Sequence, residues 1–499
     1  MNVAEVYSSS IPFYAVFVSL IAVPLILLSS RFPNLREFWT IAASFLKFAL
    51  VFTLLPDALH DRVAECRILE ITPGIDLALK TDAFGVFFAL IASGLWIFTS
   101  FYSIGYVRGL NEQKQTRYFA SFAICLSATM GIAFSANLIT FIVFYEILTV
   151  ATYPLVIHKE TPVAISAGRK YLLYTLSAGV LLIAAAGWTY SLIGTLDFQP
   201  GGMFGESAIS GEAMKGLFLL FLGGVGVKAS IMPIHSWLPT AMAAPTPVSA
   251  LLHAVAVVKS GVFGVFRVVG FVFGPDVMAA HGLDIILLIL SGITIIMASL
   301  LAFNEDNLKR RLAYSTVGHL SYIVMGAALL SANSFTGGIL HIATHATMKI
   351  TLFFCAGAIY VNVHKENISD LDGVGKAMPW TMGAFTVGAI GLAGIPPVDG
   401  FISKWYLGAG ALESGEIIAL MILVISGLLN AGYLFPIVHR AFFRSSKNFD
   451  GHGEAHPFMV VPLIVTAMAS LLFGLAPNLF FQFYDLAVKI SQSVIGGVH

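Results

Sequence analysis

The sequence predicts an all-α integral membrane protein of about fourteen transmembrane helices, and three observations lead to this fold class. The 499 residues are 58% hydrophobic and 11% charged, with a mean hydropathy of +0.87, far from the usage of soluble globular domains. Several apolar runs, such as residues 11–30, 83–105 and 285–303, reach the roughly 20 residues that a spanning helix needs. The sequence lacks the alternation of apolar and polar residues that is typical of barrel strands.

The apolar runs divide residues 1–499 into a single polytopic membrane domain. The predicted helices lie at about 11–30, 38–56, 83–105, 117–136, 138–157, 169–194, 215–232, 248–271, 283–303, 311–331, 335–362, 380–408, 416–440 and 457–478. No Lys or Arg precedes the first run, so we expect it to be a retained span rather than a secretory signal. The last stretch, residues 478–495, is partly amphipathic and is expected along the membrane interface.

Lys and Arg are distributed unevenly between the predicted loops. Sixteen follow odd-numbered helices: Arg31, Arg36, Arg108, Lys114, Arg117, Lys159, Arg169, Lys170, Lys309, Arg310, Arg311, Lys365, Lys376, Arg440, Arg444 and Lys447. Four follow even-numbered helices: Arg62, Arg67, Lys80 and Lys215. Because short cytoplasmic loops carry an excess of cations, the sequence predicts a multi-pass cell (inner) membrane protein with both termini on the periplasmic or exterior side.

Composition also excludes several function classes. The formal net charge is zero, so nothing suggests a nucleic-acid partner. The three cysteines, Cys66, Cys125 and Cys355, are widely spaced and form no CxxC pair. The pattern therefore predicts neither a disulfide framework nor a zinc or iron–sulfur site, and we expect the chain to carry no cofactor. Any redox chemistry would belong to a partner.

Charged residues inside the apolar runs are the main functional signal. Six cations remain outside the loops and the tail: Lys47, Lys228, Lys259, Arg267, Lys349 and Lys404. Each such charge costs about 2.5–3.5 kcal/mol at a helix centre on insertion scales, so it should face the protein interior and have a function or a partner. Lys47 is expected to be structural or to snorkel, and Arg267 to anchor at the interface. Glu146 lies mid-helix and Asp399 at a helix break.

Two interpretations apply to Glu146, Lys228, Lys259 and Lys404. Buried ion pairs could hold the helices together, but apolar packing achieves the same result more cheaply. We therefore favour a row of groups that carries protons.

Proline and glycine predict that the seventh and twelfth helices are discontinuous. Pro233, Pro239, Pro245 and Pro247 follow Lys228, and Gly394-Ile395-Pro396-Pro397 precedes Lys404. Unpaired carbonyls at membrane depth are tolerated only beside protein or water. Broken helices in corresponding halves of a chain are typical of transport sites.

Histidines extend this polar set. His341, His345 and Lys349 recur every four residues, which places them in one stripe of the eleventh helix. A His pair at this spacing could bind zinc, but no third ligand accompanies it, so we favour a hydrated proton path. His253 and Lys259 lie about 120° apart around their helix, so His253 should face a neighbouring helix.

At these residues the sequence resembles the antiporter-like family shared by Mrp-type multisubunit cation/proton antiporters, the large membrane subunits of respiratory complex I, and membrane-bound hydrogenases. The most specific motif residues are Lys228-Ala229-Ser230, Pro233, His235, Trp237-Leu238-Pro239, Pro245-Thr246-Pro247-Val248-Ser249-Ala250, His253, Val258-Lys259 and Arg267. Further matches are Phe144-Tyr145-Glu146, Asp306, Lys309-Arg310, Leu312-Ala313-Tyr314-Ser315, His345-Ala346, Lys349, Gly394-Ile395-Pro396-Pro397, Gly400-Phe401 and Ser403-Lys404. The resemblance covers nearly the whole chain after residue 80.

The resemblance implies two inverted five-helix repeats, residues 117–271 (helices four to eight) and 283–440 (helices nine to thirteen). It also implies a proton route through Glu146, Lys228, Lys259 and Lys404, with no cofactor. The family often has acidic residues where this chain has Thr240 and Ala243, which leaves the contacts of that loop in question.

Within the family, Tyr145 and Tyr153-Pro154 around Glu146, together with residues 401–405, look most similar to the D-type subunit of Mrp antiporters. The favoured hypothesis is a proton-carrying subunit of a Mrp-type antiporter that exchanges Na⁺ or another cation for protons, with other membrane subunits as partners. The alternative is a pumping subunit of a redox complex of the NADH-quinone oxidoreductase, formate hydrogenlyase or membrane-bound hydrogenase type. A purely structural subunit would leave four buried charges without a role.

The loop cations generate a topology test. A C-terminal alkaline phosphatase fusion should be active, because sixteen cations against four place the termini outside. An inactive phosphatase fusion combined with an active cytoplasmic reporter at the same position would overturn the helix count.

Overall fold

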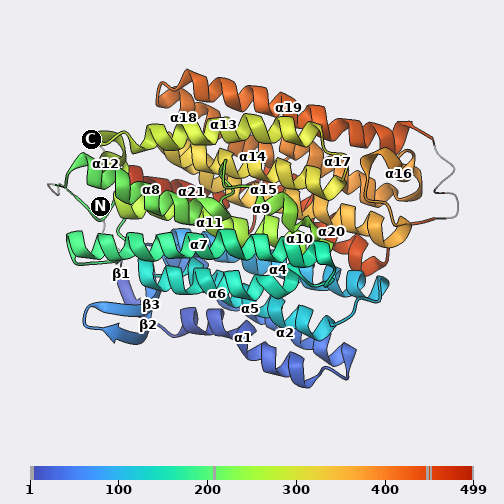
Figure 1. Ribbon diagram of the computed structural model, residues 1–499, viewed down its shortest axis with the longest axis horizontal. Helices are drawn as coiled ribbons and strands as arrows, with labels where there is room; N and C mark the ends of the chain where they lie inside the picture. The colour runs from blue at the N-terminus through green and yellow to red at the C-terminus, as the bar shows by residue number, and fades with distance from the viewer. Residues whose placement is uncertain (1–4, 206–208, 446–448, 450–451, 497–499) are drawn as a thin grey trace.

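The helices of this protein run side by side in one elongated bundle (Figure 1). The computed structural model describes residues 5–205, 209–445, 449 and 452–496, so the predicted loop cation Lys447 lies outside the described residues. Both chain ends lie at the same end of the bundle, and helix α16 (Val374–Ala377) lies at the opposite end. A long central helix, α15, contacts many of the other elements.

Helices account for most of the fold. The long helices are α1 (Ile11–Leu28), α2 (Pro33–Phe52), α4 (Ala83–Gly109), α5 (Gln115–Ala133), α6 (Leu138–Val156), α7 (Pro162–Ile193), α8 (Gly211–Lys228), α11 (Val257–Arg267), α13 (Leu283–Phe303), α14 (Leu308–Ala328), α15 (Ala332–Val363), α17 (Pro379–Ala393), α18 (Gly400–Glu413), α19 (Ile417–Phe443), α20 (Pro457–Leu475) and α21 (Phe483–Ile495). The short ones are α3 (Leu55–Leu59), α9 (Trp237–Thr240), η1 (Ala241–Ala243), α10 (Thr246–Ala250), η2 (Leu251–Val255), η3 (Val268–Phe273), α12 (Pro275–Ala280) and η4 (Ile368–Asp370).

The predicted membrane fold is confirmed in type. Each predicted helical range contains helix, and in the part of the chain that the structure describes, ten helical segments are long and apolar enough to cross a membrane. The count of fourteen spans stays a prediction, as does the inverted relation of residues 117–271 and 283–440. The amphipathic tail forms α21, which packs against α4 and α15.

Both predicted helix breaks are present. Helix α8 ends at Lys228 and helical structure resumes only at Trp237, whose indole Nε1 donates to the Val227 carbonyl at 2.8 Å. The same carbonyl accepts from the Ser230 amide at 3.0 Å, so both bonds fix the chain at the break. Helix α17 ends at Gly394, whose φ of +85° suits glycine, and α18 begins six residues later.

A small sheet was not predicted. Strand β1 (Glu5–Ser8) pairs in parallel with β2 (Arg62–Thr72), which forms an antiparallel hairpin with β3 (Ile75–Lys80). The hairpin turns at Gly74, where φ is +83°. Its strands lie at the end of the bundle that holds the chain termini (Figure 1), and they occupy the segment that the helix pattern left unassigned.

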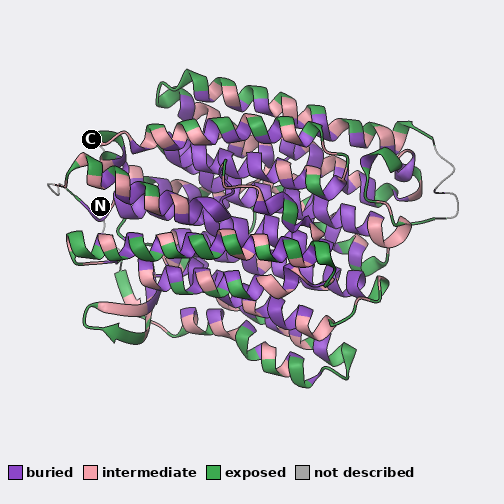
Figure 2. Ribbon diagram, viewed as in Figure 1, coloured by how far each residue is buried: buried purple, intermediate pink, exposed green. Residues whose placement is uncertain are grey.

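Helices α10, η2, α11 and η3 form one continuous rod, and it is fully buried (Figure 2). Two of its segments, η2 and η3, are π-helical, with i→i+5 bonds such as Ala256 N to the Leu251 carbonyl at 3.0 Å. Such wide turns are rare and occur frequently at functional sites. The rod packs beside α15 and α8, so the predicted polar residues of the eighth and eleventh helices face one another across the core.

The packing of this rod on α8 generates a stability test. A Cβ at Gly261 would lie 2.2 Å from the Ala229 backbone nitrogen, whereas a Cβ at Gly187 on α7 meets nothing within 4 Å. We expect Gly261→Ala to lower the midpoint of thermal unfolding in detergent, because two backbones must separate. Gly187→Ala should leave the midpoint unchanged or raise it, since alanine favours helix. Equal midpoints for the two variants would contradict this packing.

Candidate functional site

The row of polar groups begins with Glu146 on α6. Its side chain is partly buried and faces α7, where a Cβ at Gly179 would lie 2.4 Å from Oε1. Glycine at that position makes room for the carboxyl group. Oε1 is buried without a hydrogen-bond partner among the described residues.

Lys228 is the last residue of α8 and is fully buried. Its Nζ donates to the Tyr145 carbonyl at 2.6 Å and lies 3.3 Å from the centroid of the Tyr145 ring. Lys228 and Glu146 form no ion pair within 4.0 Å among the described side chains, although Lys228 binds the backbone of Tyr145, the residue next to Glu146. The helix break thus places the ammonium group against α6 and leaves the carboxylate separate.

A direct contact joins the eighth and eleventh predicted helices. Lys259 on α11 and His345 on α15 are both fully buried, and Lys259 Nζ lies 2.8 Å from His345 Nδ1. An amine and an imidazole in such contact can share and exchange a proton. The structure therefore brings together two predicted residues that lie 86 positions apart in sequence.

His319 on α14 completes this cluster, and the sequence pattern did not predict it. Its ring centroid lies 5.4 Å from that of His345, and its Nδ1 lies 3.1 Å from His341 Nε2. Both rings are fully buried. The sequence signal for His319 was a single histidine in the middle of an apolar helix, and such a residue is easily interpreted as part of the hydrophobic core. Its role becomes visible only from the packing of α14 against α15.

The row continues to the second broken helix. His341 Nδ1 lies 2.8 Å from the Ser403 hydroxyl on α18. The adjacent Lys404 is partly exposed and donates from Nζ to the Leu392 carbonyl at 2.6 Å. Asn430 on α19 donates to the same carbonyl at 3.3 Å. Leu392 is in the last turn of α17, so the break supplies the acceptor.

Two further predicted residues lie beside the row. Lys349 is fully buried and donates to the Leu312 carbonyl of α14 at 3.1 Å. His253 in η2 faces the neighbouring α15, where its ring lies 4.7 Å from that of Phe353, and neither ring nitrogen has a partner among the described residues. Neither side chain forms a hydrogen bond with the Lys259–His345 pair in the described part of the chain.

Asp399 is the buried carboxyl group of the α17–α18 break. It accepts hydrogen bonds from Thr347 at 2.7 Å and from Ser470 at 2.5 Å. These contacts tie the break to α15 and α20, which is a positioning role. Among the described residues no group of three His, Cys, Asp or Glu side chains could hold a metal ion.

Arg267, which we expected at the membrane surface, and Lys47, which we expected to be structural or to snorkel, both lie inside the bundle. Arg267 is almost fully buried and forms a two-pronged ion pair with Asp82, at 2.5 and 2.8 Å. Asp82 also accepts from the Gly85 amide and thereby caps α4. The interfacial role predicted for Arg267 is therefore wrong. Lys47 is 0% exposed, so the snorkelling alternative is wrong as well.

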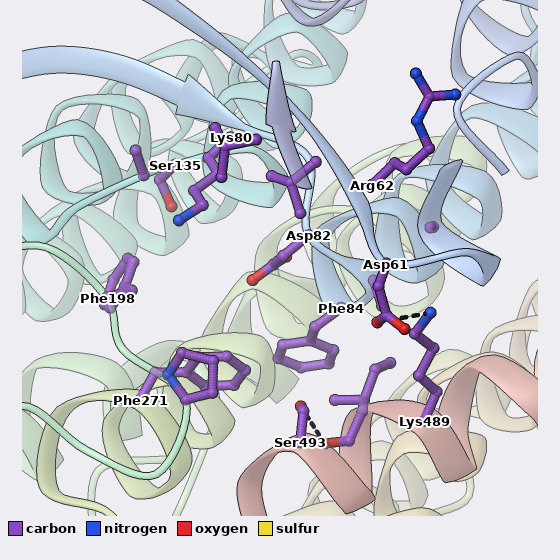
Figure 3. A pocket seen from close by; sticks show the side chains of 17 residues that line it. Asp61, Arg62, Lys80, Asp82, Phe84, Ser135, Phe198, Phe271, Lys489 and Ser493 are labelled. Carbon is purple, nitrogen blue, oxygen red and sulfur yellow. Dashed lines mark hydrogen bonds and ion pairs between the residues drawn. The ribbon is translucent and has the colours of Figure 1, made fainter. Parts of the chain in front are cut away.

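Asp82 also lines a cavity of about 340 Å³ at the end of the bundle that holds the termini (Figure 3). Figure 3 shows Lys80, Asp82 and Phe84 on one side, and the ion pair of Asp61 with Lys489 on another. The cavity lies between the β-hairpin and α21, and Lys489 of α21 contacts Asp61 at 2.9 Å and the Leu59 carbonyl at 2.8 Å beside it.

The opposite end of the bundle carries an ionic loop cluster. Glu160 pairs with Lys114 and Arg117, and these contacts lower its pKa to about 2. His158 is buried beside this cluster, and both ring nitrogens lack a hydrogen-bond partner among the described residues. Burial first, and then the charge of Arg117, lower the pKa of His158 to about 4.

Residues 135–430, more than half of the chain, match the protein family described as NADH:quinone oxidoreductase/Mrp antiporter, TM. Among curated proteins, the chain is 29% identical to NADH-quinone oxidoreductase subunit N of Desulforudis audaxviator, over 77% of this chain and 80% of that protein. It is 28% identical to the D-type subunit of the Na⁺/H⁺ antiporter of Alkalihalophilus pseudofirmus, over 83% of each. It is 31% identical to hydrogenase-4 component B of Escherichia coli, over 81% of this chain and 63% of that protein.

Two solved structures share the fold. A chain of the Mrp complex from Dietzia sp. superposes with a TM-score of 0.86 at 20% identity, covering 98% of both chains. A chain of the archaeal membrane-bound sulfane sulfur reductase, a respiratory membrane complex, superposes with a TM-score of 0.85 at 21% identity, covering 98% of this chain and 100% of that one. Identity this low supports likeness of fold alone.

His158 generates a pH test. Its folded pKa of about 4 lies below the unfolded value of about 6.5. The unfolded state therefore binds more protons, and the stability contribution of neutral His158 is present above about pH 6.5 and is lost as the pH falls toward 4. We expect His158→Gln to flatten the decrease of the unfolding midpoint between pH 6.5 and 4, measured in detergent. An unchanged pH profile would show that His158 is already accessible to protons in the folded state.

Proposed function

The chain belongs to the NADH:quinone oxidoreductase/Mrp antiporter transmembrane family, and we propose that it is the proton-carrying subunit of a multisubunit membrane complex. The favoured complex is a Mrp-type antiporter that exchanges Na⁺ for protons. One observation carries this proposal most strongly, which is the series of buried side chains from Lys259 through three histidines to Ser403. Hydrogen bonds join Lys259 to His345, His319 to His341 and His341 to Ser403, and the rings of His345 and His319 lie 5.4 Å apart between their centroids.

Protons can move along this series by exchange between adjacent groups. Lys259 donates to His345 or accepts from it, depending on which group is protonated. The His319 ring is hydrogen-bonded to His341 and lies beside the His345 ring, so a reorientation of one of these two rings is required for transfer between them. Ser403 can accept and donate through one hydroxyl group. Lys404, next to Ser403 and partly exposed, is the proposed exchange point toward one side of the membrane.

A second requirement is an acceptor that tolerates a change of charge, and the lysines at both helix breaks have one. Lys228 and Lys404 each bind a backbone carbonyl at 2.6 Å. A lysine side chain retains N–H donors after it loses a proton, so either form can keep this contact. A carboxylate at the same place would hold the charged form much more strongly.

Glu146 and Lys228 are proposed as the entry of the row. The two charges act across α6 rather than in direct contact, since Lys228 binds the carbonyl of Tyr145. The unpartnered Oε1 of Glu146 supports a role in receiving protons from outside this group of helices. His253 in η2 and Lys349 on α15 are proposed to carry protons toward the Lys259–His345 pair.

A redox-driven complex is the second candidate, because the matched relatives include subunits of an NADH-quinone oxidoreductase and a hydrogenase. In that case electron transfer in other subunits supplies the energy, and this chain still carries the protons. A Na⁺ pulse separates the two functions. Collapse of a proton gradient by Na⁺ in vesicles without any redox substrate supports antiport. A gradient that responds only to a redox substrate supports the second candidate.

We also propose that the complex lies in the cell membrane with both termini on the exterior side. Both ends of the chain lie at one end of the bundle, and the loop cation Lys376 belongs to α16 at the other end. This arrangement agrees with the loop-charge rule.

Lys228 provides a direct test of proton transport. Lys228→Ala should reduce transport at least about tenfold, which corresponds to about 1.4 kcal/mol in the limiting step. The measurement is proton flux in proteoliposomes that contain the whole complex, with assembly verified on native gels. Lys215→Ala is the matched control, because Lys215 lies on the same helix but is exposed, and its flux should equal that of the wild type.

Full proton flux in an assembled Lys228→Ala complex would contradict the proposed function. The chain would then be a structural subunit that binds its partners and fills the membrane. His319→Phe gives an independent check, because the ring volume is kept while the contact with His341 is lost. Its flux should fall at least about tenfold as well.

A further inference from the structure

Lys47 lies outside the row just described, in the N-terminal group of helices formed by α1, α2, α4 and α5. It is 0% exposed. Its Nζ donates to the Val16 carbonyl of α1 at 3.4 Å and to the Leu126 carbonyl of α5 at 3.3 Å. It also lies 5.8 Å from the centroid of the Trp96 ring on α4. In the described part of the chain, no carboxylate lies within 4.0 Å of this ammonium group.

The surroundings of Lys47 hold further polar atoms. Ser127 on α5 donates to the same Val16 carbonyl at 2.8 Å. Ser19 Oγ on α1 and Trp96 Nε1 on α4 are buried without a hydrogen-bond partner among the described residues. Unsatisfied polar groups are rare in native interiors, and each needs an explanation. Here they occur on helices that pack around one buried lysine.

A stripe of buried polar residues on α2 extends from this place to the edge of the bundle, and the hydroxyls of Thr40 and Ser44 in it donate to carbonyls of their own helix, at 3.4 and 2.7 Å. Glu37, Thr40, Ser44 and Lys47 are all buried, and their spacing of three, four and three residues keeps them on one face of α2. With a rise of 1.5 Å per residue, the stripe is about 15 Å long, half of a bilayer core. Glu37 ends it in an ion pair with the half-exposed Arg108, where solvent is near.

The elements packed around Lys47 carry other titratable or charged groups. Those on the elements packed around it are Tyr14 on α1, Arg36 and Glu37 on α2, Tyr102, Tyr106 and Arg108 on α4, and Arg117, Tyr118 and Cys125 on α5. Among these side chains, Glu37 is the carboxylate, and it is engaged by Arg108 and Arg36. None of these described groups therefore holds Lys47 permanently in its charged form.

We propose that Lys47 is a second proton-loading residue, which exchanges protons with the solvent at Glu37 through the polar stripe of α2. The inference rests on the proposed transport function and adds a branch to it. Lys47 contacts α5, which packs on α6, the helix of Glu146. Its charge can thus act on the entry of the row by electrostatic interaction through a medium of low dielectric constant.

Structural roles give different expectations. If Lys47 only fills space, a neutral side chain of similar length should preserve transport and remove the cost of desolvating the ammonium group. If it is needed as a fixed charge, arginine should replace it, because the guanidinium stays protonated. Proton loading requires instead a group that can change its charge.

Three variants of Lys47 separate these roles: Lys47→Met, Lys47→Arg and Lys47→His. We expect proton flux of the assembled complex in proteoliposomes to fall at least fivefold for Met and for Arg. Histidine can titrate, so Lys47→His should recover part of the flux and shift its pH optimum downward. The thermal unfolding midpoint of Lys47→Met should equal or exceed that of the wild type, which separates loss of transport from loss of folding.

Thr40→Val tests the stripe, because it removes the hydroxyl group and keeps the shape. Its flux should fall at least twofold.

Wild-type flux in assembled Lys47→Met would overturn the proposal, as would wild-type flux in Lys47→Arg. Lys228→Ala, measured in parallel, distinguishes this proposal from the proposed function. If Lys228→Ala is inactive and Lys47→Met is fully active, proton transport by this chain is retained as the proposed function and only the role of Lys47 is excluded.

Discussion

Backbone carbonyl oxygens, rather than carboxylates, hold most of the buried lysines of this protein. Those bound in this way are Lys47, Lys228, Lys309 and Lys349, and the partly exposed Lys404 also binds a backbone carbonyl. A peptide carbonyl is a neutral acceptor. Inside a membrane it is available to a side chain only at the end of a helix, or where it accepts a second hydrogen bond in addition to the one within its helix. Lys404 binds a carbonyl at the end of α17, whereas Lys228, Lys47 and Lys349 pack against carbonyls of the neighbouring helices α6, α5 and α14. The arrangement lets the charge change while the geometry stays.

Arg267 and Asp82 show the opposite solution. Their ion pair joins two charges of opposite sign at 2.5 and 2.8 Å, and Phe84, Phe263 and Phe271 surround the guanidinium. Arginine stays protonated in proteins, and the paired carboxylate reinforces that state. Such a pair fixes α4 to α11 and suits an anchor rather than a carrier. The Arg267–Asp82 pair therefore contrasts with the proposed proton-carrying lysines, which bind neutral carbonyls.

Much of the fold could be predicted because it depends on local composition. Apolar runs predicted the helices, and the proline and glycine residues around Lys228 and Lys404 predicted the breaks. Both signals depend on residues that are close together in the sequence. Contacts between distant segments could not be predicted. His319 was missed because its role depends on the side-by-side packing of α14 and α15, and Arg267 was misplaced because its partner is 185 positions away. The hairpin at 62–80 is too short and too mixed in composition to show in a search for apolar helices.

The π-helical turn at His253 has a consequence for Lys259. A turn with i→i+5 bonds holds one residue more than an α-helical turn, so the residues that follow it are rotated by about 100° relative to a regular helix. Lys259 follows this turn and, in the register that the structure has, its Nζ lies 2.8 Å from His345 Nδ1. Transfer of the additional residue to the next turn would rotate Lys259 away from His345 without moving either end of the rod. The connectivity of the row is therefore set by the register of a single wide turn.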